Sequence, residues 1–102
     1  MLNKLTGQFE AASASYADAH GIERDPDWFL LKLQEEVGEL TQAWNRKTGR
    51  GRKKGRSEAE LDRDLADETA DLLGHVLLFA HTNGLDLAAA IERKWLFRPA
   101  QD

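Results

Sequence analysis

Acidic residues set among apolar ones mark two stretches of the sequence. The first is "LQEEVGEL" and the second is "DETADLLGHVLLFA". Glu36 and Glu39 are three residues apart, and so are Glu68 and Asp71. This spacing places both acids of a pair on one face of an α-helix. We therefore expect two carboxylate pairs, one on each of two helices.

Glu68 occupies a position within an apolar stripe, whose other members are Leu61, Leu65, Leu72, Val76 and Phe79. A charged carboxylate in such a place is costly unless something compensates it. If the two helices pack through their stripes, the four acids converge. They are then stable together when protonated, paired with Lys or Arg, or bound to a cation. The nearby basic residues lie on a Gly-rich loop, so a cation is the better account.

An all-oxygen set of ligands selects a hard cation, Mg²⁺ or Mn²⁺ before Zn²⁺. Mg²⁺ usually keeps several waters and takes its remaining ligands from a phosphate-bearing substrate. A di-iron site is less suitable because it uses Glu-x-x-His, and His75 stands four residues after Asp71. The acid pairs therefore indicate nucleotide chemistry.

The stripe of the earlier helix is expected to consist of Phe29, Leu33, Val37, Leu40 and Trp44. At about 100° per residue, Glu36 then lies at the edge of the buried face and Glu39 farther round. Glu35 lies close to the opposite side. His75 and His81 are interpreted as ordinary helix residues, not metal ligands.

Four helices are expected to position these acids, at residues 2–20, 26–47, 58–82 and from 87 to about 97. Asp25, Ser57 with Glu60, and Asp86 are the expected N-caps, and glycines follow the first and third helices. The first helix is expected to bury Leu2, Leu5, Phe9, Ala12 and Tyr16. Strand-like alternation is absent, so the predicted fold class is all-α.

A chain of 102 residues forms one small domain, here residues 1–102. A basic Gly-rich loop at about residues 46–57 holds seven of the fourteen Lys and Arg. It is either a solvated loop or a contact for phosphate. The net charge of −4 argues against a general nucleic-acid binder, and the absence of Cys excludes disulfides and thiolate sites. No signal peptide or membrane span is recognisable, so we expect a soluble, cytoplasmic protein.

The tryptophans Trp28, Trp44 and Trp95 are interpreted as core or dimer-interface aromatics. Trp44 is also a candidate for contact with a nucleotide base, because it lies between the acids and the basic loop. Lys32, one turn before Glu36, is a further candidate for contact with the substrate.

The order "EEVGEL" followed by "DETADLL" resembles the EExxE…ExxD signature of the MazG-like, all-α nucleoside triphosphate pyrophosphohydrolases. The second stretch also resembles phosphoribosyl-ATP pyrophosphohydrolase, from the same superfamily. The segment "GLDLAAAIERKWLFR" is similar to the closing helix of the family. The resemblance covers roughly residues 25–98, and the long basic loop departs from it, which leaves the choice of substrate open.

The resemblance implies Mg²⁺-dependent hydrolysis of a nucleoside triphosphate between the α- and β-phosphates, giving a monophosphate and pyrophosphate. Carried onto this chain, the metal ligands are Glu36, Glu39, Glu68 and Asp71. The candidate catalytic residues are Glu35 and Glu36. Glu35 orients the attacking water, binds a second ion, or has no catalytic part. Lys94 and Arg98 would pair with the β- and γ-phosphates, although both also suit the end of their helix.

Three further expectations accompany this resemblance. The substrate is a dNTP or a non-standard NTP removed as nucleotide-pool house-cleaning, or, alternatively, phosphoribosyl-ATP. A second alternative is a non-catalytic helical module that binds nucleic acid or a phosphorylated partner through the basic loop. Because four helices are too few to close a bundle around a nucleotide, we expect a homodimer or a dimer of dimers, a homotetramer.

Overall fold

Helices dominate the chain, which a computed structural model describes over residues 1–100. They are α1 (Leu2–His20), α2 (Pro26–Lys47), α3 (Glu58–Thr82) and α4 (Leu87–Trp95). No strand occurs within the described residues. The expected all-α fold is confirmed. None of the helices in this part of the chain is long and apolar enough to span a membrane.

Capping residues explain where the helices begin and end. The Asp25 carboxylate accepts a hydrogen bond from the backbone N–H of Trp28 at 2.8 Å, which starts α2. Ser57 and Glu60 form the expected capping box at the start of α3, each side chain accepting from the other's backbone N–H. Gly21 ends α1 in the left-handed conformation, with φ of 64°.

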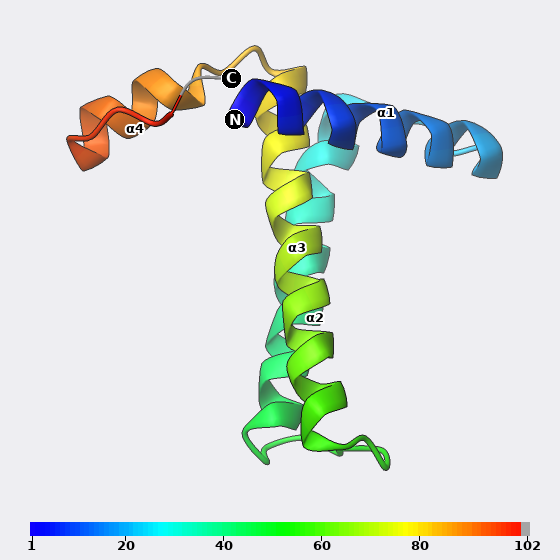
Figure 1. The fold of residues 1–102 in the computed structure, drawn as a ribbon. Helices are drawn as coiled ribbons and strands as arrows, with labels where there is room; N and C mark the ends of the chain where they lie inside the picture. The colour runs from blue at the N-terminus through cyan, green and yellow to red at the C-terminus, as the bar shows by residue number, and fades with distance from the viewer. Residues whose placement is uncertain (101–102) are drawn as a thin grey trace.

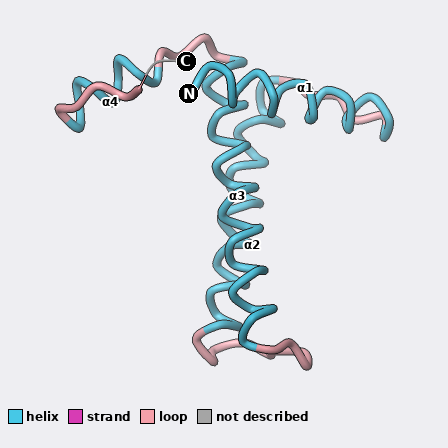
Figure 2. Tube along the Cα trace, viewed as in Figure 1, coloured by secondary structure: helices cyan, strands magenta, loops and turns pink. Residues whose placement is uncertain are grey.

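The helices together form a T (Figure 1). The antiparallel pair α2 and α3 is the long stem, α1 crosses one end of it, and α4 leaves the same end on the other side. The loop between α2 and α3 closes the opposite end of the stem (Figure 2). The stem therefore separates this loop from both α1 and α4.

Small and aliphatic side chains fill the contacts between helices. Leu61 and Leu77 are fully buried, and Ala43 of α2 is buried against α3. A Cβ atom added at Gly74 would lie 2.7 Å from the Phe9 ring. The glycine therefore allows α1 to pack closely onto α3.

The buried face of α2 is rotated from the predicted one: Phe29 is buried as expected, but the rest of the predicted stripe is not. Val37 and Trp44 are each about half exposed, at 49% and 48%, whereas Glu36 is only 6% exposed. The buried residues of α2 are Phe29, Glu36 and Ala43, which recur at seven-residue spacing along one face. The apolar stripe continues onto a surface that a single chain does not cover, and this is why its periodicity misplaced the centre. On α3, Val76 is likewise exposed.

Two smaller expectations are also wrong. In α1, Ala12 and Tyr16 are exposed and Ala17 is the buried residue, because the helix crosses the stem instead of packing along it. The last helix ends at Trp95 and not near Phe97, because Leu96 adopts a left-handed φ of 64°.

Candidate metal and nucleotide site

Three carboxylates meet in the middle of the stem. Glu36 and Glu39 of α2 and Glu68 of α3 each offer an oxygen, and these oxygens lie within 4.8 Å of one another. We call these three residues the acid cluster. The i, i+3 pair on α2 faces a single acid on α3, so the antiparallel packing of the two helices creates the cluster.

Within the acid cluster, Glu36 is buried and Glu39 and Glu68 are half-buried, and the cluster is incompletely satisfied. One carboxylate oxygen of Glu36 and one of Glu68 are buried without a hydrogen-bond partner. Burial raises the pKa of the Glu36 carboxyl, and the charges of Glu39 and Asp71 raise it further. Burial likewise raises the pKa of Glu68, with the Glu39 carboxylate as the next cause. Desolvation and mutual repulsion therefore both oppose full ionisation of the cluster.

The protein groups beside Glu36 compensate little of this charge. Lys32 Nζ lies 3.9 Å from Glu36 Oε1 but is closer to Glu35, at 3.1 Å. His75 Nε2 lies 3.8 Å from Glu36 Oε1, and burial followed by the charge of Lys32 lowers the pKa of the imidazole. His75 is thus held toward its neutral form, and Lys32 is shared between Glu36 and the more exposed Glu35.

This arrangement fits a divalent cation. The ligand atoms are all carboxylate oxygens, which suit Mg²⁺ or Mn²⁺. The two unpartnered oxygens of Glu36 and Glu68 would gain a partner, and the repulsion among the three acids would be relieved. Buried acids without partners are rare in proteins, and a bound ion can satisfy them.

The other two predicted acids lie at the margin of the cluster. Asp71 is exposed and is not one of the three clustered residues, although its charge acts on Glu36 and both line one cavity. The Glu35 side chain is 53% exposed and accepts a hydrogen bond from Lys32. Both acids are therefore near the site without belonging to its buried part.

A cavity of about 510 Å³ opens beside the acid cluster, between α1 and the stem. Glu36, Asp71 and Lys32 form its polar side, and aromatic side chains from α1 and α2 form much of the rest, namely Phe9, Tyr16 and Trp28. Its volume is in the usual range for small-molecule sites. An apolar, aromatic wall next to carboxylates suits a ligand with one flat end and one charged end.

Trp28 and Tyr16 were not predicted as site residues. Trp28, Lys32 and Glu36 follow one another at four-residue spacing, which puts them on one face of α2. That spacing could have identified Trp28 as a site residue from the sequence. Tyr16 had no comparable signal, because its place depends on the angle at which α1 crosses the stem.

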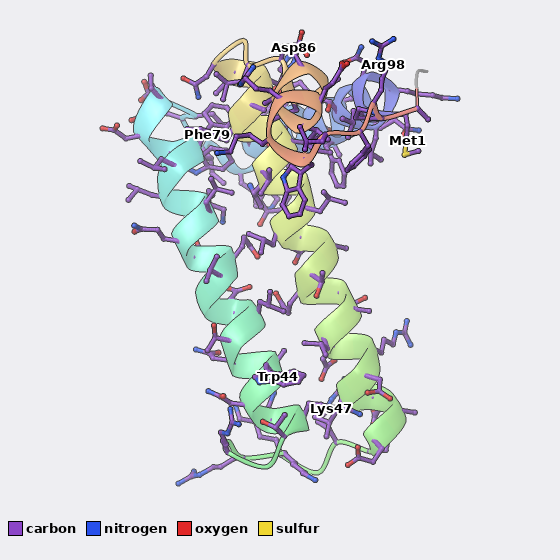
Figure 3. All side chains as sticks on the ribbon, turned by 90° about the vertical axis from the view of Figure 1, so that its left-hand side faces the viewer. Met1, Trp44, Lys47, Phe79, Asp86 and Arg98 are labelled. Atoms are coloured by element: carbon purple, nitrogen blue, oxygen red, sulfur yellow. The ribbon has the colours of Figure 1, made fainter. Side chains whose placement is uncertain are left out.

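Three predicted substrate contacts are not near the acid cluster in the single chain. Trp44 lies at the loop end of the stem, beside Lys47, whereas Arg98 lies beside Met1 at the opposite end (Figure 3). Lys94 belongs to α4, which points away from the stem (Figure 1). Their predicted role in binding a substrate therefore has no support from the geometry of one chain.

The basic loop is engaged with the acids that begin α3. Lys47 pairs with Asp62 and Glu58, and Lys53 lies 3.4 Å from Glu58. Arg56 makes two hydrogen bonds to Asp64, at 2.6 and 3.1 Å. These exposed pairs favour the solvated-loop interpretation over a contact with phosphate.

The sequence matches the model of the phosphoribosyl-ATP pyrophosphohydrolase family over residues 8–93. The chain belongs to this family. No curated protein and no solved structure matches it. The resemblance to MazG-like enzymes is thus confirmed at the level of the superfamily that both families share. Membership of the phosphoribosyl-ATP pyrophosphohydrolase family indicates a pyrophosphohydrolase activity, and hydrolases of this family typically depend on a divalent metal.

The matched segment contains the acid cluster and every residue that lines the cavity. It ends at Arg93, within α4. Lys94 and Arg98 therefore lie just beyond it, so their assignment still rests on the resemblance of the closing helix alone.

Proposed function

We propose that the chain is a Mg²⁺-dependent pyrophosphohydrolase that cleaves a nucleoside triphosphate between its α- and β-phosphates. The observation that carries this proposal is the acid cluster, with its two unpartnered carboxylate oxygens, at the edge of an aromatic cavity. The acid cluster would bind the metal and the phosphates, and the aromatic wall of the cavity would stack on the base. The two sides of the site therefore match the two ends of a nucleotide.

Glu36, Glu39 and Glu68 would hold the metal, and Asp71 would reach it from the margin of the cluster. A bound divalent ion neutralises charge on phosphate oxygens and lowers the pKa of an attacking water. Glu35 remains partly exposed, and Lys32 fixes its carboxylate. We propose that Glu35 orients the water, while Glu36 acts in catalysis as a ligand of the ion that would activate this water.

The nucleoside would occupy the cavity between α1 and the stem. Trp28 offers an indole face at the start of α2, and Tyr16 lies at the rim on α1. Stacking on an aromatic ring binds any base, because every base has a π-face. Lys32 lies between the aromatic wall and the acids, where it would contact an α-phosphate oxygen.

Two substrate classes fit this arrangement. One is a dNTP or a non-standard NTP, whose removal would serve nucleotide-pool house-cleaning. The other is phosphoribosyl-ATP, which the family match favours. The chain's basic loop is already paired with acids of α3, so a non-catalytic module gripping phosphorylated partners has less support.

The test is a panel of standard and modified NTPs and dNTPs, together with phosphoribosyl-ATP, incubated with Mg²⁺ and then with EDTA. Ion-exchange chromatography would separate the products. We expect monophosphate and pyrophosphate without diphosphate, and only with metal. Diphosphate as the first product, or turnover unchanged by EDTA, would contradict the proposal.

A cavity-filling variant tests where the nucleoside binds. Ala12 lines the cavity from α1 and is exposed, so Ala12→Trp can occupy the space without touching the acids. We expect KM for the substrate to rise on the order of tenfold, the value of one lost stacking contact, with Mn²⁺ affinity unchanged. Ala19→Trp, farther along α1 and outside the cavity lining, is the control.

A further inference from the structure

The imidazole ring of His75, on α3, lies close to two residues of α2. Its centroid is 6.0 Å from that of the Trp28 ring, and the two rings meet edge-on at an interplanar angle of 68°. Its Nε2 atom is 3.8 Å from Glu36 Oε1. All three side chains line the cavity between α1 and the stem. The imidazole therefore connects the aromatic wall of the cavity with its acidic side.

A nucleotide whose two ends lie at Trp28 and Glu36 has its sugar beside His75. Trp28 and Glu36 are eight residues apart, which is about 12 Å along a helix. With the base on Trp28 and the phosphates at Glu36, the sugar lies between them, next to Lys32 and His75. Lys32 Nζ already donates a hydrogen bond to Glu35. His75 is therefore the better candidate for a hydrogen bond to the sugar.

The ring nitrogens of His75 are not engaged elsewhere in the described part of the chain. Nδ1 is buried and has no hydrogen-bond partner there. The distance of 3.8 Å from Nε2 to Glu36 Oε1 is too long for a hydrogen bond. By contrast, Nδ1 of His20 lies 2.8 Å from the carbonyl oxygen of Tyr16, one turn earlier on its own helix. The imidazole of His75 thus keeps its hydrogen-bonding capacity for a ligand.

Nε2 is the nitrogen of His75 that would donate to this ligand. A neutral imidazole carries one N–H donor and one acceptor nitrogen. An N–H group buried at Nδ1 without an acceptor is less favourable than an N–H group at Nε2, which lies toward a carboxylate. The charged ring also carries a proton on Nε2. Nε2 therefore donates in either state of the ring.

The donor on His75 and the acceptor on Glu36 together suit a hydroxyl group. An oxygen about 2.8 Å from each atom fits between Nε2 and Oε1, which are 3.8 Å apart. A hydroxyl accepts from the N–H group and donates to the carboxylate through the same oxygen. A phosphate oxygen without a proton would be repelled by Glu36. The second carboxylate oxygen, Glu36 Oε2, has no partner within residues 1–100 and stays available to a metal.

We propose that His75 Nε2 and Glu36 Oε1 together bind one hydroxyl of the nucleotide sugar, which makes His75 a specificity-determining residue. The inference rests on the proposed function, because the place of the sugar follows from a base at Trp28 and phosphates at the acid cluster. The 2′ and 3′ hydroxyls share this chemistry. A nucleotide that lacks the bound hydroxyl leaves a donor and an acceptor unpaired and binds more weakly.

Calorimetric titration with uncleavable nucleotides measures the contribution of the hydroxyl. The α,β-methylene analogues of ATP, GTP, CTP, UTP and phosphoribosyl-ATP, each with Mn²⁺, identify the ligand that binds most tightly. Its 2′-deoxy and 3′-deoxy forms, changed in the sugar next to the phosphates, are then compared with it. We expect at least one of the two to bind about tenfold more weakly. Equal affinity of all three forms would overturn the proposal.

Substitutions of His75 test whether Nε2 is responsible. The amide of glutamine can place an N–H group near the position of Nε2, whereas that of asparagine reaches only as far as Nδ1. We expect His75→Gln to keep the preference for the hydroxyl, and His75→Asn and His75→Phe to reduce it below about threefold. A loss of stability changes both affinities by the same factor and leaves their ratio unaltered. An unaltered ratio in His75→Phe would therefore overturn the proposal.

His81→Phe is the matched control, because His81 is exposed on the same helix and lies outside the cavity lining. It should change neither the affinity nor the ratio. Mn²⁺ affinity without nucleotide should stay the same in His75→Phe, since His75 and Glu36 are not hydrogen-bonded. A loss of Mn²⁺ affinity with an unaltered ratio would show that His75 orients Glu36 and does not contact the ligand.

Failure of this inference and failure of the proposed function give different results. If no α,β-methylene nucleotide binds in Mn²⁺, both are contradicted. If a nucleotide binds, but with the same affinity when either hydroxyl is missing, only the role of His75 is refuted. In that case the acid cluster and the aromatic wall remain the basis of nucleotide binding.

Discussion

The unpartnered oxygens of Glu36 and Glu68 mark the acid cluster as a place where charge is concentrated without compensation. Such a site destabilises the metal-free fold, and a bound cation removes that penalty. Binding of a metal at the acid cluster would therefore be coupled to folding of the stem. The effects of substitutions here should differ in sign between metal-free and metal-bound protein.

Glu68→Gln is expected to raise the melting temperature in EDTA, because it removes one repelling carboxylate and keeps the shape of the side chain. The same change should lower Mn²⁺ affinity by more than the roughly 10- to 100-fold typical of residues that only support a metal ligand. Differential scanning calorimetry and Mn²⁺ titration measure the two effects. Glu58→Gln, an exposed acid two to three turns earlier in α3, is the control. Unchanged Mn²⁺ affinity in Glu68→Gln would refute the assignment.

The raised pKa values of Glu36 and Glu68 give the metal-free protein an unusual pH dependence. A carboxyl whose folded pKa exceeds its unfolded value stabilises the fold when protonated, and this contribution is lost as pH rises through the folded pKa. In EDTA, the melting temperature should thus increase from pH 7 toward the ordinary pKa of glutamate. Mn²⁺ affinity should fall over the same interval because protons compete with the ion. A melting temperature that falls from pH 7 downward in EDTA would contradict this.

The packing of α1 on α3 includes one close contact, between the Phe9 ring and Gly74. Gly74→Ala forces the Phe9 ring away from α3, because the added Cβ would lie 2.7 Å from it. Overpacking of this kind costs about 1–3 kcal/mol. Gly38→Ala, on α2 with open space around the added atom, should instead stabilise by roughly 0.5–1 kcal/mol. Urea unfolding of both variants measures the difference, and equal effects would show that α1 is not held by this contact.

The helices were predictable because their signals are local. Asp25, Ser57 with Glu60, and Asp86 act within three residues of the helix ends they cap, and all three caps are present. The buried face of α2 was not predictable in the same way. Val37 and Trp44 belong to an apolar stripe, but which face meets α3 depends on how α3, beyond the basic loop, packs on α2.

In the candidate site, too, features set by spacing within one helix were predictable, and features set by packing between helices were not. The i, i+3 spacing of Glu36 and Glu39 predicted a shared face, and the structure places both beside Glu68. Asp71 is exposed whereas Glu68 is half-buried. The angle between these two positions around α3 is too small for the periodicity of the sequence to predict which of them faces α2. The cavity could not be foreseen, because α1 reaches it only by crossing the stem.

At the scale of the whole molecule, the T shape leaves surface that a monomer cannot bury. If a second copy buries it, unfolding includes dissociation and the melting temperature rises with protein concentration. Calorimetry at two concentrations tenfold apart should show the rise. The variant Trp95→Asp with Phe97→Asp should show none. Concentration-independent melting of the natural chain would indicate a folded monomer.

The basic loop between α2 and α3 and the connection between α1 and α2 differ in how well they tolerate an insertion. The basic loop closes the end farthest from α1, and its residues line no part of the cavity (Figure 2). In contrast, Arg24 in the connection before α2 reaches back to Glu10 and Ser13 of α1 and so sets the position of that helix. Insertions near Gly51 should accumulate freely among natural variants of this chain and suit the attachment of a tag. An insertion near Gly21 would detach α1 and open the cavity.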